Sequence, residues 1–299
     1  MYNFKFIHTG TKLRLLHDPP GVKKGQIFAM LQKAIRDTTG TKIEPPYFVR
    51  LKIKPYFCPD MTNVFIMQKT AIRISHIPAI IWGSKSEKVI IAIHGNRSNK
   101  ADTPIEIVAQ NTLPNDYQVL SFDLPEHGDR INEGIPCKVR SCVKDLITVM
   151  QYAKTNWKHI DLFANSIGAY FSLLAYPEEV IGKAWFLSPI VDMRRLIENM
   201  MTWFSITEEE LKRQQTISTP IGQKLYWDYY GFVKDHPIHH WNTPTHILYG
   251  SKDELCENDV ISRFAEQFSC QLEIVEGSEH YFHTQEQLTV FNEWIGRTL

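Results

Sequence analysis

The sequence lacks the features that would place it in a membrane or build it around metal or disulfide bonds. No apolar run approaches the ~20 residues that a membrane span needs, and no apolar stretch follows the first basic residues, so no secretory signal is expected. The five cysteines are an odd number without CxxC spacing, which predicts reduced thiols and no zinc site. These absences favour a cytoplasmic protein with no transmembrane segment.

The formal net charge is zero, but positive and negative residues are unevenly distributed along the chain. Residues 1–60 contain 11 Lys and Arg against 4 Asp and Glu, or +7, and residues 61–299 contain 22 against 29, or −7. This change predicts a boundary near Met61, with a basic N-terminal extension (1–60) of unknown role before a second domain (61–299). Within the extension we expect a helix over Gln26–Arg36 and a strand over Tyr47–Tyr56. Aromatic residues are sparse among its basic ones and no recognition motif is present, so nucleic-acid binding is not expected.

From Val64 onward, short apolar runs alternate with segments of helix length. The run Lys88–His94 is apolar almost throughout, as expected for a strand buried on both faces. Such alternation predicts an α/β protein with a mostly parallel sheet and helices on both faces. Strands are expected at Val64–Gln68, Ala71–Ser75, Ala79–Trp82, Lys88–His94, Tyr117–Phe122, from His159 up to Ala164, and at Lys183–Ser188, Thr245–Gly250 and Gln271–Val275. Helices are expected from Asp102 and at Cys137–Trp157, Asn258–Phe268 and Gln285–Gly296.

The most informative stretch is His159–Tyr170, which begins with an apolar strand. This strand runs into Ala164-Asn-Ser166-Ile-Gly168 and then into small and apolar residues of helical character. A nucleophilic serine on a sharp strand-to-helix turn has this context, since only small neighbours fit around it. Alanine stands where the first glycine of G-x-S-x-G would be, and it is small enough to keep the turn. The alternative is an ordinary serine that caps a helix after a core strand.

A carboxylate that could orient a base follows a later strand. Asp253 lies in Gly250-Ser-Lys-Asp253, just past the end of the strand Thr245–Gly250. Ligands and chemistry gather beyond the carboxyl ends of strands in open α/β sheets. Glu254 is adjacent and Asp192 follows the preceding strand, so both remain substitutes for Asp253.

The candidate base is His280, in Gly277-Ser-Glu-His280 after the last strand. A neutral imidazole is the side chain best suited to accept and return a proton near pH 7. His283 is the alternative, although its position at the entry to the final helix suits packing or capping. The order serine, aspartate, histidine is that of the α/β-hydrolases and not of chymotrypsin or subtilisin.

Two backbone N–H groups are needed to hold an oxyanion. Ile167, directly after the serine, supplies one, and the turn His94-Gly95-Asn96 should supply the other from Asn96. His94 itself is interpreted as a residue that shapes this loop rather than as a second base.

These motifs together resemble those of the α/β-hydrolases, from Val64 to the C-terminus. The matching segments are His94-Gly-Asn96, Asp123-Leu-Pro-Glu-His-Gly128, Ala164-Asn-Ser-Ile-Gly168, Gly250-Ser-Lys-Asp253 and Gly277-Ser-Glu-His280. The family commonly shows D-x-P-G-H-G in the second of these, so Glu126 is a departure in a structural turn. The resemblance implies an α/β-hydrolase fold with a mostly parallel eight-stranded sheet, helices on both faces and a helical cap insertion.

The cap is expected at about Met193–Thr243, which interrupts the alternation and is rich in aromatic residues. Most of these aromatics are expected to pack internally, and the rest to line an apolar acyl site. The histidines His236, His239 and His240 are not expected to bind metal, because Pro237 breaks their helical spacing and no carboxylate or cysteine is arranged with them.

The expected activity is that of a serine-dependent, carboxylesterase-like hydrolase, with Ser166 as nucleophile, His280 as base, Asp253 as orienting acid, and Ile167 and Asn96 as oxyanion donors. It would cleave a small carboxylic ester with an apolar acyl part through an acyl-enzyme, and it would need no metal or cofactor. A thioesterase, a peptidase or an acyltransferase would use the same groups, and a non-catalytic ligand-binding protein is the rival from another class. The oligomeric state stays open.

Overall fold

The computed structural model describes residues 6–9, 12–15, 63–64 and 67–299. The chain divides into two units, Met1–Ile66 and Met67–Leu299. In the first unit, strands β1 (Phe6–Thr9), β2 (Lys12–Leu15) and β3 (Asn63–Val64) form an antiparallel sheet in that order. The helix expected at Gln26–Arg36, the strand expected at Tyr47–Tyr56 and the boundary expected near Met61 lie outside the described residues.

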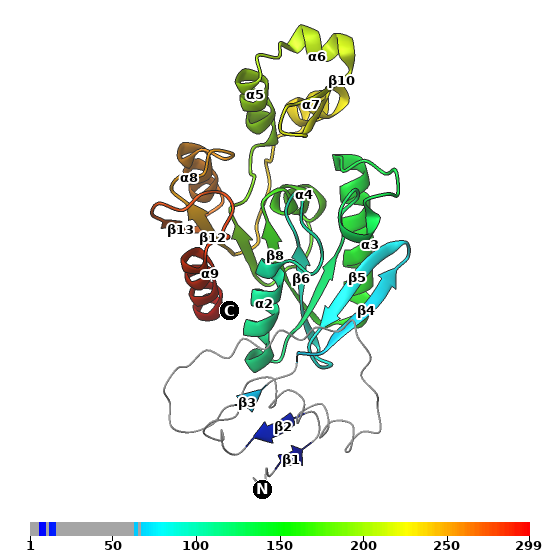
Figure 1. Cartoon of the computed structure of the whole chain (residues 1–299), viewed down its shortest axis with the longest axis vertical. Helices are drawn as coiled ribbons and strands as arrows, with labels where there is room; N and C mark the ends of the chain where they lie inside the picture. Colours follow the sequence, from blue (N-terminus) through cyan, green and yellow to red (C-terminus); the bar gives the residue numbers. More distant parts are fainter. Residues whose placement is uncertain (1–5, 10–11, 16–62, 65–66) are drawn as a thin grey trace, which may run out of the picture. The chain divides into compact units, whose positions relative to one another are not determined.

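The second unit is built on an eight-stranded sheet, which confirms the prediction (Figure 1). The strand order is β13-β12-β9-β8-β6-β7-β5-β4, and only the pairs β4–β5 and β5–β7 are antiparallel. The strands are β4 (Lys69–Ile74), β5 (Ile77–Trp82), β6 (Lys88–Ile93), β7 (Gln118–Phe122), β8 (His159–Asn165), β9 (Ala184–Leu187), β12 (Thr245–Gly250) and β13 (Gln271–Val275).

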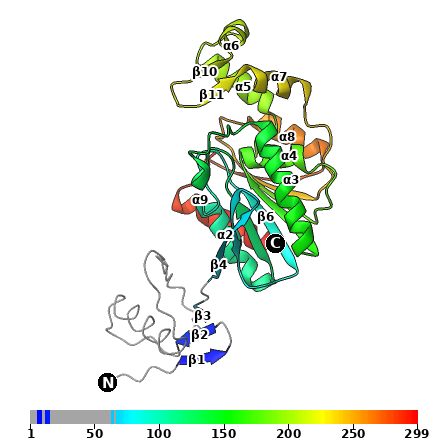
Figure 2. The same cartoon turned by 90° about the vertical axis from the view of Figure 1, so that its right-hand side faces the viewer.

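Helices cover both faces of the sheet, because alternate residues of its central strands are apolar on both sides (Figures 1 and 2). In β6, Ile91 and Ile93 pack with the residues of one core, while Ile90 and Ala92 pack with those of the other. Helices α3 (Val139–Asn156), α4 (Ile167–Ala175) and α8 (Asn258–Gln267) contribute to the first core, and α2 (Thr103–Thr112) and α9 (Gln285–Thr298) to the second. Two short 3-10 turns, η1 (Leu113–Asn115) and η2 (Gly128–Arg130), complete this part of the unit.

The strand expected at Val64–Gln68 is wrong as a strand of the main sheet. Asn63 and Val64 belong to β3 and pair with β2, and Met67 and Gln68 lie in no strand. The sheet begins at Lys69 because that residue pairs with Trp82, the last residue of β5. Gly83 follows Trp82 with a φ of 89°, so the chain turns out of the direction of β5 directly after that strand ends.

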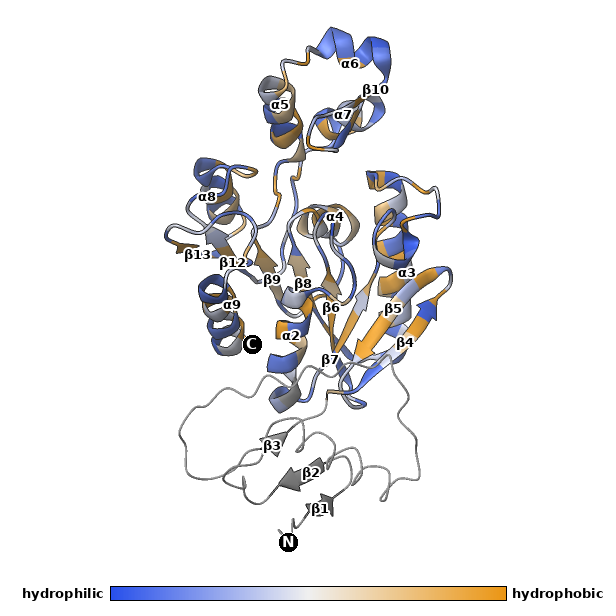
Figure 3. Ribbon diagram, viewed as in Figure 1, coloured by the Kyte–Doolittle hydropathy of each residue, from blue (hydrophilic) through white to orange (hydrophobic). Residues whose placement is uncertain are grey.

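The segment Met193–Thr243, called here the inserted segment, lies between β9 and β12 and is mainly helical (Figure 1). It contains α5 (Met193–Trp203), α6 (Glu208–Gln214), a hairpin of β10 (Thr216–Ser218) and β11 (Lys224–Tyr226), and α7 (Trp227–Asp235). Helix α6 is hydrophilic in Figure 3. It forms because Thr207 caps it by accepting the N–H of Glu210, with three glutamates in its first turn and Lys212 and Arg213 in its last, which suits the helix dipole.

Candidate active site

Ser166 occupies a strained turn between the central strand β8 and helix α4. Its backbone has φ 54° and ψ −119°, a conformation that costs about 1–3 kcal/mol in a residue with a side chain. The neighbouring strand holds this turn in place. The N–H of Ser166 donates to the Leu187 carbonyl at 3.0 Å, and its own carbonyl accepts the N–H of Ile190 at 3.1 Å. The serine hydroxyl is thereby fixed at the N-terminal end of α4.

Close packing around the turn explains its small residues. A Cβ on Gly168 would lie 2.7 Å from the His94 carbonyl oxygen, so glycine is required where α4 crosses the end of β6. A Cβ on Gly95 would lie 3.1 Å from the Cβ of Ser166. The loop after β6 and the serine turn therefore lie against each other.

The structure brings Ser166, His280 and Asp253 together from three loops. Ser166 Oγ lies 2.8 Å from His280 Nε2, and His280 Nδ1 lies 2.7 Å from Asp253 Oδ2. The other carboxylate oxygen of Asp253 accepts the N–H groups of Leu255 at 2.9 Å and Cys256 at 3.1 Å. With its carboxylate fixed in this way, Asp253 can accept a hydrogen bond from the Nδ1–H of His280, which leaves Nε2 free to accept the hydroxyl proton of Ser166.

The loops that carry Asp253 and His280 are in close backbone contact with each other. A Cβ on Gly250 would lie 2.4 Å from the Ser278 carbonyl oxygen, so only glycine permits the two loops to approach this closely. The N–H of Lys252 donates to that same carbonyl at 2.9 Å. Asp253 and His280 therefore keep their spacing through backbone contacts as well as through their own hydrogen bond.

The residues considered as substitutes have other partners. Asp192 accepts the N–H of Arg195 at 2.9 Å and so caps α5. Glu254 is exposed, and His283 is exposed with its Nδ1 2.7 Å from the Tyr281 carbonyl oxygen. Of the candidates weighed from the sequence, Asp253 and His280 are the two that meet beside Ser166.

His94 shapes the loop that follows β6. Its side chain is fully buried, its Nδ1 lies 2.7 Å from the Gly95 carbonyl oxygen, and its Nε2 accepts the N–H of Leu124 at 3.0 Å. Burial lowers the pKa of His94 to about 4, because an imidazolium would lose its hydration. The neutral ring therefore bridges the loop after β6 and the turn after β7.

Asn96, the expected second oxyanion donor, is held through its side chain by two residues that the sequence did not single out. Its amide donates to Gln223 Oε1 at 3.0 Å, and its carbonyl oxygen lies 3.1 Å from His127 Nε2. The Arg97 guanidinium also donates to the Ile221 carbonyl. The turn between β10 and β11 thus contacts the loop of Asn96.

His127 had a partial signal in the sequence, because it lies in the segment Asp123–Gly128. Its Nδ1 lies 2.8 Å from the Pro125 carbonyl oxygen, so both ring nitrogens face oxygen acceptors, which suits the imidazolium form. Burial opposes this form, but the nearby Cys137 raises the pKa of His127. Gln223 had no such signal, since it follows Asn96 by 127 residues.

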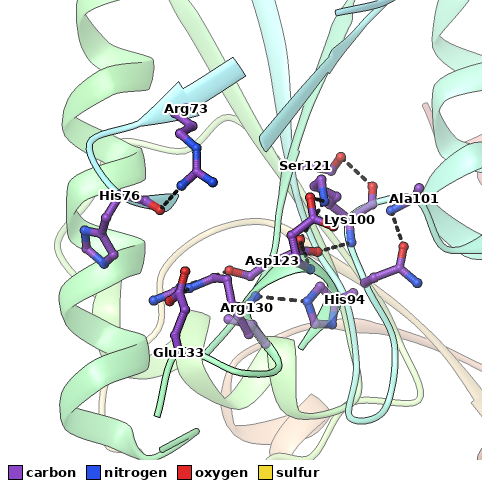
Figure 4. Close-up of polar contacts among 12 residues, drawn as sticks. Arg73, His76, His94, Lys100, Ala101, Ser121, Asp123, Arg130 and Glu133 are labelled. Carbon is purple, nitrogen blue, oxygen red and sulfur yellow. Dashed lines mark hydrogen bonds and ion pairs between the residues drawn. The ribbon is translucent and has the colours of Figure 1, made fainter. Parts of the chain in front are cut away.

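A buried polar network holds the turn that carries His127 (Figure 4). Asp123 accepts the Lys100 N–H at 2.8 Å, the Lys100 Nζ at 2.6 Å and the Asp129 N–H at 2.9 Å. Gly128 lies so close that a Cβ there would be 2.3 Å from the Asp123 carboxylate. Arg130 donates to the Asp123 carbonyl at 3.0 Å. This network positions the turn without contacting Ser166.

Glu126 stands in this turn where the α/β-hydrolases commonly have glycine. It has a φ of 62°, so the position has the left-handed backbone that favours glycine. The Glu126 carboxylate accepts the N–H of Cys137 at 2.8 Å, a contact that glycine could not make.

Among residues 67–299 and the described strands before them, no group of three or more His, Cys, Asp or Glu is arranged to hold a metal ion. His236 stacks on Phe232 with ring centroids 4.1 Å apart, and His240 contacts Asn242 and Glu178. In the same part of the chain, every helix is too short or too polar to cross a bilayer.

Comparison with known proteins gives one partial sequence match and many structural ones. No family model matches the chain. A probable serine hydrolase of Drosophila melanogaster is 30% identical over 117 residues, and the match spans 33% of this chain and 30% of that protein. The chain therefore matches less than a third of the length of this relative.

The solved structures similar to this chain are matched over most of their length. Est1E from Butyrivibrio proteoclasticus, with ferulic acid bound, has a TM-score of 0.62 at 19% identity, covering 77% of this chain and 97% of that one. Mouse alpha/beta hydrolase domain-containing protein 10 has a TM-score of 0.62 at 15% identity, covering 77% of this chain and 98% of that one. An esterase of Pyrococcus furiosus has a TM-score of 0.55 at 18% identity, covering 79% and 89%. The chain has the α/β-hydrolase fold, as its motifs predict.

Proposed function

We propose that this protein is a serine hydrolase that cleaves carboxylic esters through an acyl-enzyme. The observation that carries the proposal is the hydrogen-bonded series from Ser166 Oγ to His280 Nε2 at 2.8 Å and from His280 Nδ1 to Asp253 Oδ2 at 2.7 Å. It begins at a strained serine on a helix N-terminus. A serine in an ordinary capping role needs neither a histidine nor a buried carboxylate behind it.

In the first half-reaction, His280 Nε2 accepts the proton of Ser166 as Oγ attacks the ester carbonyl carbon. The tetrahedral intermediate collapses when the imidazolium returns that proton to the leaving alcohol, which gives an acyl-serine. In the second half-reaction, His280 takes a proton from water as the resulting hydroxide attacks the acyl carbonyl carbon. The imidazolium then returns this proton to Ser166 Oγ as the bond to the acyl group breaks, which releases a carboxylic acid and restores the serine. Asp253 keeps the histidine in the required tautomer and stabilises its charged form throughout.

The oxyanion would be held by the backbone N–H groups of Ile167 and Asn96. Ile167 is the first residue of α4, so its N–H has no partner within the helix. Asn96 is held against the serine turn by Gly95 and fixed by Gln223 and His127. N–H donors that are already in place need no reorganisation to stabilise the negative charge that develops on the oxyanion. Such electrostatic stabilisation is usually the largest contribution to the rate enhancement.

The preferred substrate class is an ester of small size with an apolar acyl part, and the inserted segment would act as the cap over it. Its turn, through Gln223 and Ile221, contacts the loop of Asn96, so the segment lies beside the oxyanion donors. One structural relative holds ferulic acid and another is named an esterase, which supports this class. Turnover measured with the same acyl group presented as an ester, a thioester and an anilide would show which of the three bonds the protein cleaves best.

The test compares Ser166→Ala with wild type on a chromogenic ester and with a fluorophosphonate probe. We expect wild type to gain the mass of one probe at Ser166, and the variant to lose labelling and at least ~10³-fold in kcat. Ser172→Ala is the matched control, since Ser172 lies in the same helix with its hydroxyl bonded to the Gly168 carbonyl at 2.7 Å. Ester turnover by Ser166→Ala close to that of wild type would exclude Ser166 as nucleophile. An unlabelled, inactive wild type would instead favour a binding protein.

A further inference from the structure

A second candidate site lies between the sheet-covering helix α3 and helix α7 of the inserted segment. The cavity there has a volume of about 690 Å³, and all its lining residues fall within 138–151 and 228–232. Ser166, Asp253 and His280 come from other loops, so this is a separate place. Its volume lies within the ~300–1,000 Å³ typical of small-molecule sites, which often form between two structural parts.

The walls of the cavity are apolar on both sides. Helix α3 presents Val143 and Ile147, which are four residues apart and therefore share one face. Helix α7 presents Tyr229 and Phe232. Ile147 is 42% exposed, so part of this apolar wall is in contact with water. An apolar chain lying between the helices would remove this surface from water at about 25 cal/mol per Å².

The rim of the cavity is positively charged. Lys138, Arg140 and Lys144 line it, together with one carboxylate, Asp228. That carboxylate is already paired, since Lys138 Nζ lies 2.9 Å from both of its oxygens. Arg140 and Lys144 are exposed, and within residues 67–299 neither forms an ion pair with an acidic side chain. Two cations therefore stand beside an apolar groove with their charge uncompensated there.

We propose that this cavity binds an amphiphilic carboxylate with a straight alkyl chain. The chain would lie against Ile147 and Phe232, and the carboxylate would face Arg140 and Lys144. The complementarity has two parts: the apolar walls favour an alkyl chain over a polar ligand, and the cationic rim favours an anion over an alcohol of equal length. The site does not depend on the proposed hydrolysis, because none of its residues takes part in that chemistry.

The test measures decanoate binding to the full chain by titration calorimetry, using Ser166→Ala so that the nucleophile is absent. Decanol serves as the uncharged ligand of equal length. Ile147→Trp fills the groove at a partly exposed position, and Arg140→Glu and Lys144→Glu reverse the rim. Lys85→Glu is the matched charge reversal, since Lys85 is an exposed lysine away from the cavity.

We expect decanoate to bind at least ~10-fold more tightly than decanol, because only decanoate meets the cations. Each rim reversal should weaken decanoate about 3–10-fold at low salt and less at high salt, whereas Lys85→Glu should leave its Kd within about 2-fold. Ile147→Trp should weaken both ligands. A Kd that is the same in all four variants would place the ligand elsewhere, and an absence of decanoate binding would overturn the proposal. Far-UV circular dichroism spectra and urea denaturation midpoints close to those of Ser166→Ala alone would show that the variants fold.

Discussion

Acidification should destabilise this protein through the buried histidine His94. The folded state holds its pKa at about 4, against a usual value of 6.5, because burial disfavours the charged ring. Between these two values the unfolded chain binds a proton at His94 that the folded chain excludes. The stabilising contribution is therefore complete above pH 6.5 and is lost as pH falls toward 4.

The size of the effect follows from the two pKa values. At pH 5, a group with a pKa of about 4 when folded and 6.5 when unfolded removes about 2 kcal/mol from the free energy of unfolding, relative to pH 7.5. A loss of that size is a substantial part of the ~5–15 kcal/mol by which domains are usually stable. It is large enough to measure by urea denaturation.

The assay compares urea denaturation of wild type and His94→Gln at pH 7.5 and pH 5, followed by tryptophan fluorescence and circular dichroism. Glutamine keeps an acceptor near the Leu124 N–H but does not titrate. The variant will be less stable at both pH values, so the informative quantity is the difference between the two proteins in their pH-dependent loss. Wild type should lose about 2 kcal/mol more than His94→Gln. Equal losses in both proteins would refute the assignment of this pH dependence to His94.

Three other changes test separate parts of the structure. Gly168→Ala should destabilise the protein by about 1–3 kcal/mol and lower kcat, because its Cβ would lie 2.7 Å from the His94 carbonyl oxygen. Gly231→Ala in α7, with nothing within 4 Å of its Cβ, should be neutral or stabilising by up to about 1 kcal/mol. Chemical denaturation and turnover of both variants check this, and equal effects would contradict it. Asp253→Asn should lower kcat by about 10³–10⁴-fold through loss of the required histidine tautomer, while the exposed neighbour Glu254→Gln should keep nearly full turnover, and the reverse pattern would reassign the acid. A chain beginning at Met61 should fold and hydrolyse esters, since every hydrolase motif follows Val64; an insoluble or inactive product would move the boundary.

The α/β class and the strand ends could be read from the sequence because each depends on local pattern. Within the run Lys88–His94, Val89 to Ile93 are all apolar because β6 is buried on both faces. The motifs carrying Ser166, Asp253 and His280 follow strands of a parallel sheet, so their meeting at one edge follows from topology. Glycines mark these loops where backbones approach closely, as Gly250 does beside Ser278.

Contacts that depend on distant parts of the chain could not be read in this way. The partners of Asn96 are His127 and Gln223, which follow it by 31 and 127 residues, and no local pattern connects them. The hairpin of β10 and β11 has strands of three residues each, too short to show an alternating pattern. The pattern at Val64–Gln68 suggested a strand, but pattern alone cannot say which strand it pairs with, and Val64 pairs with Leu13 of β2.

The strands that carry Ser166, Asp253 and His280 are synthesised at different times, which matters for the chain as it emerges from the ribosome. Ser166 follows a central strand, whereas Asp253 and His280 follow β12 and β13, which form one end of the sheet. The serine precedes the histidine by 114 residues, so a ribosome completes the serine turn long before it supplies Asp253 or His280. Until β13 has joined, the nascent protein has a hydroxyl with no group to take its proton. The proposed catalytic site would therefore become complete only when β13, the last strand to be synthesised, has joined the edge of the sheet.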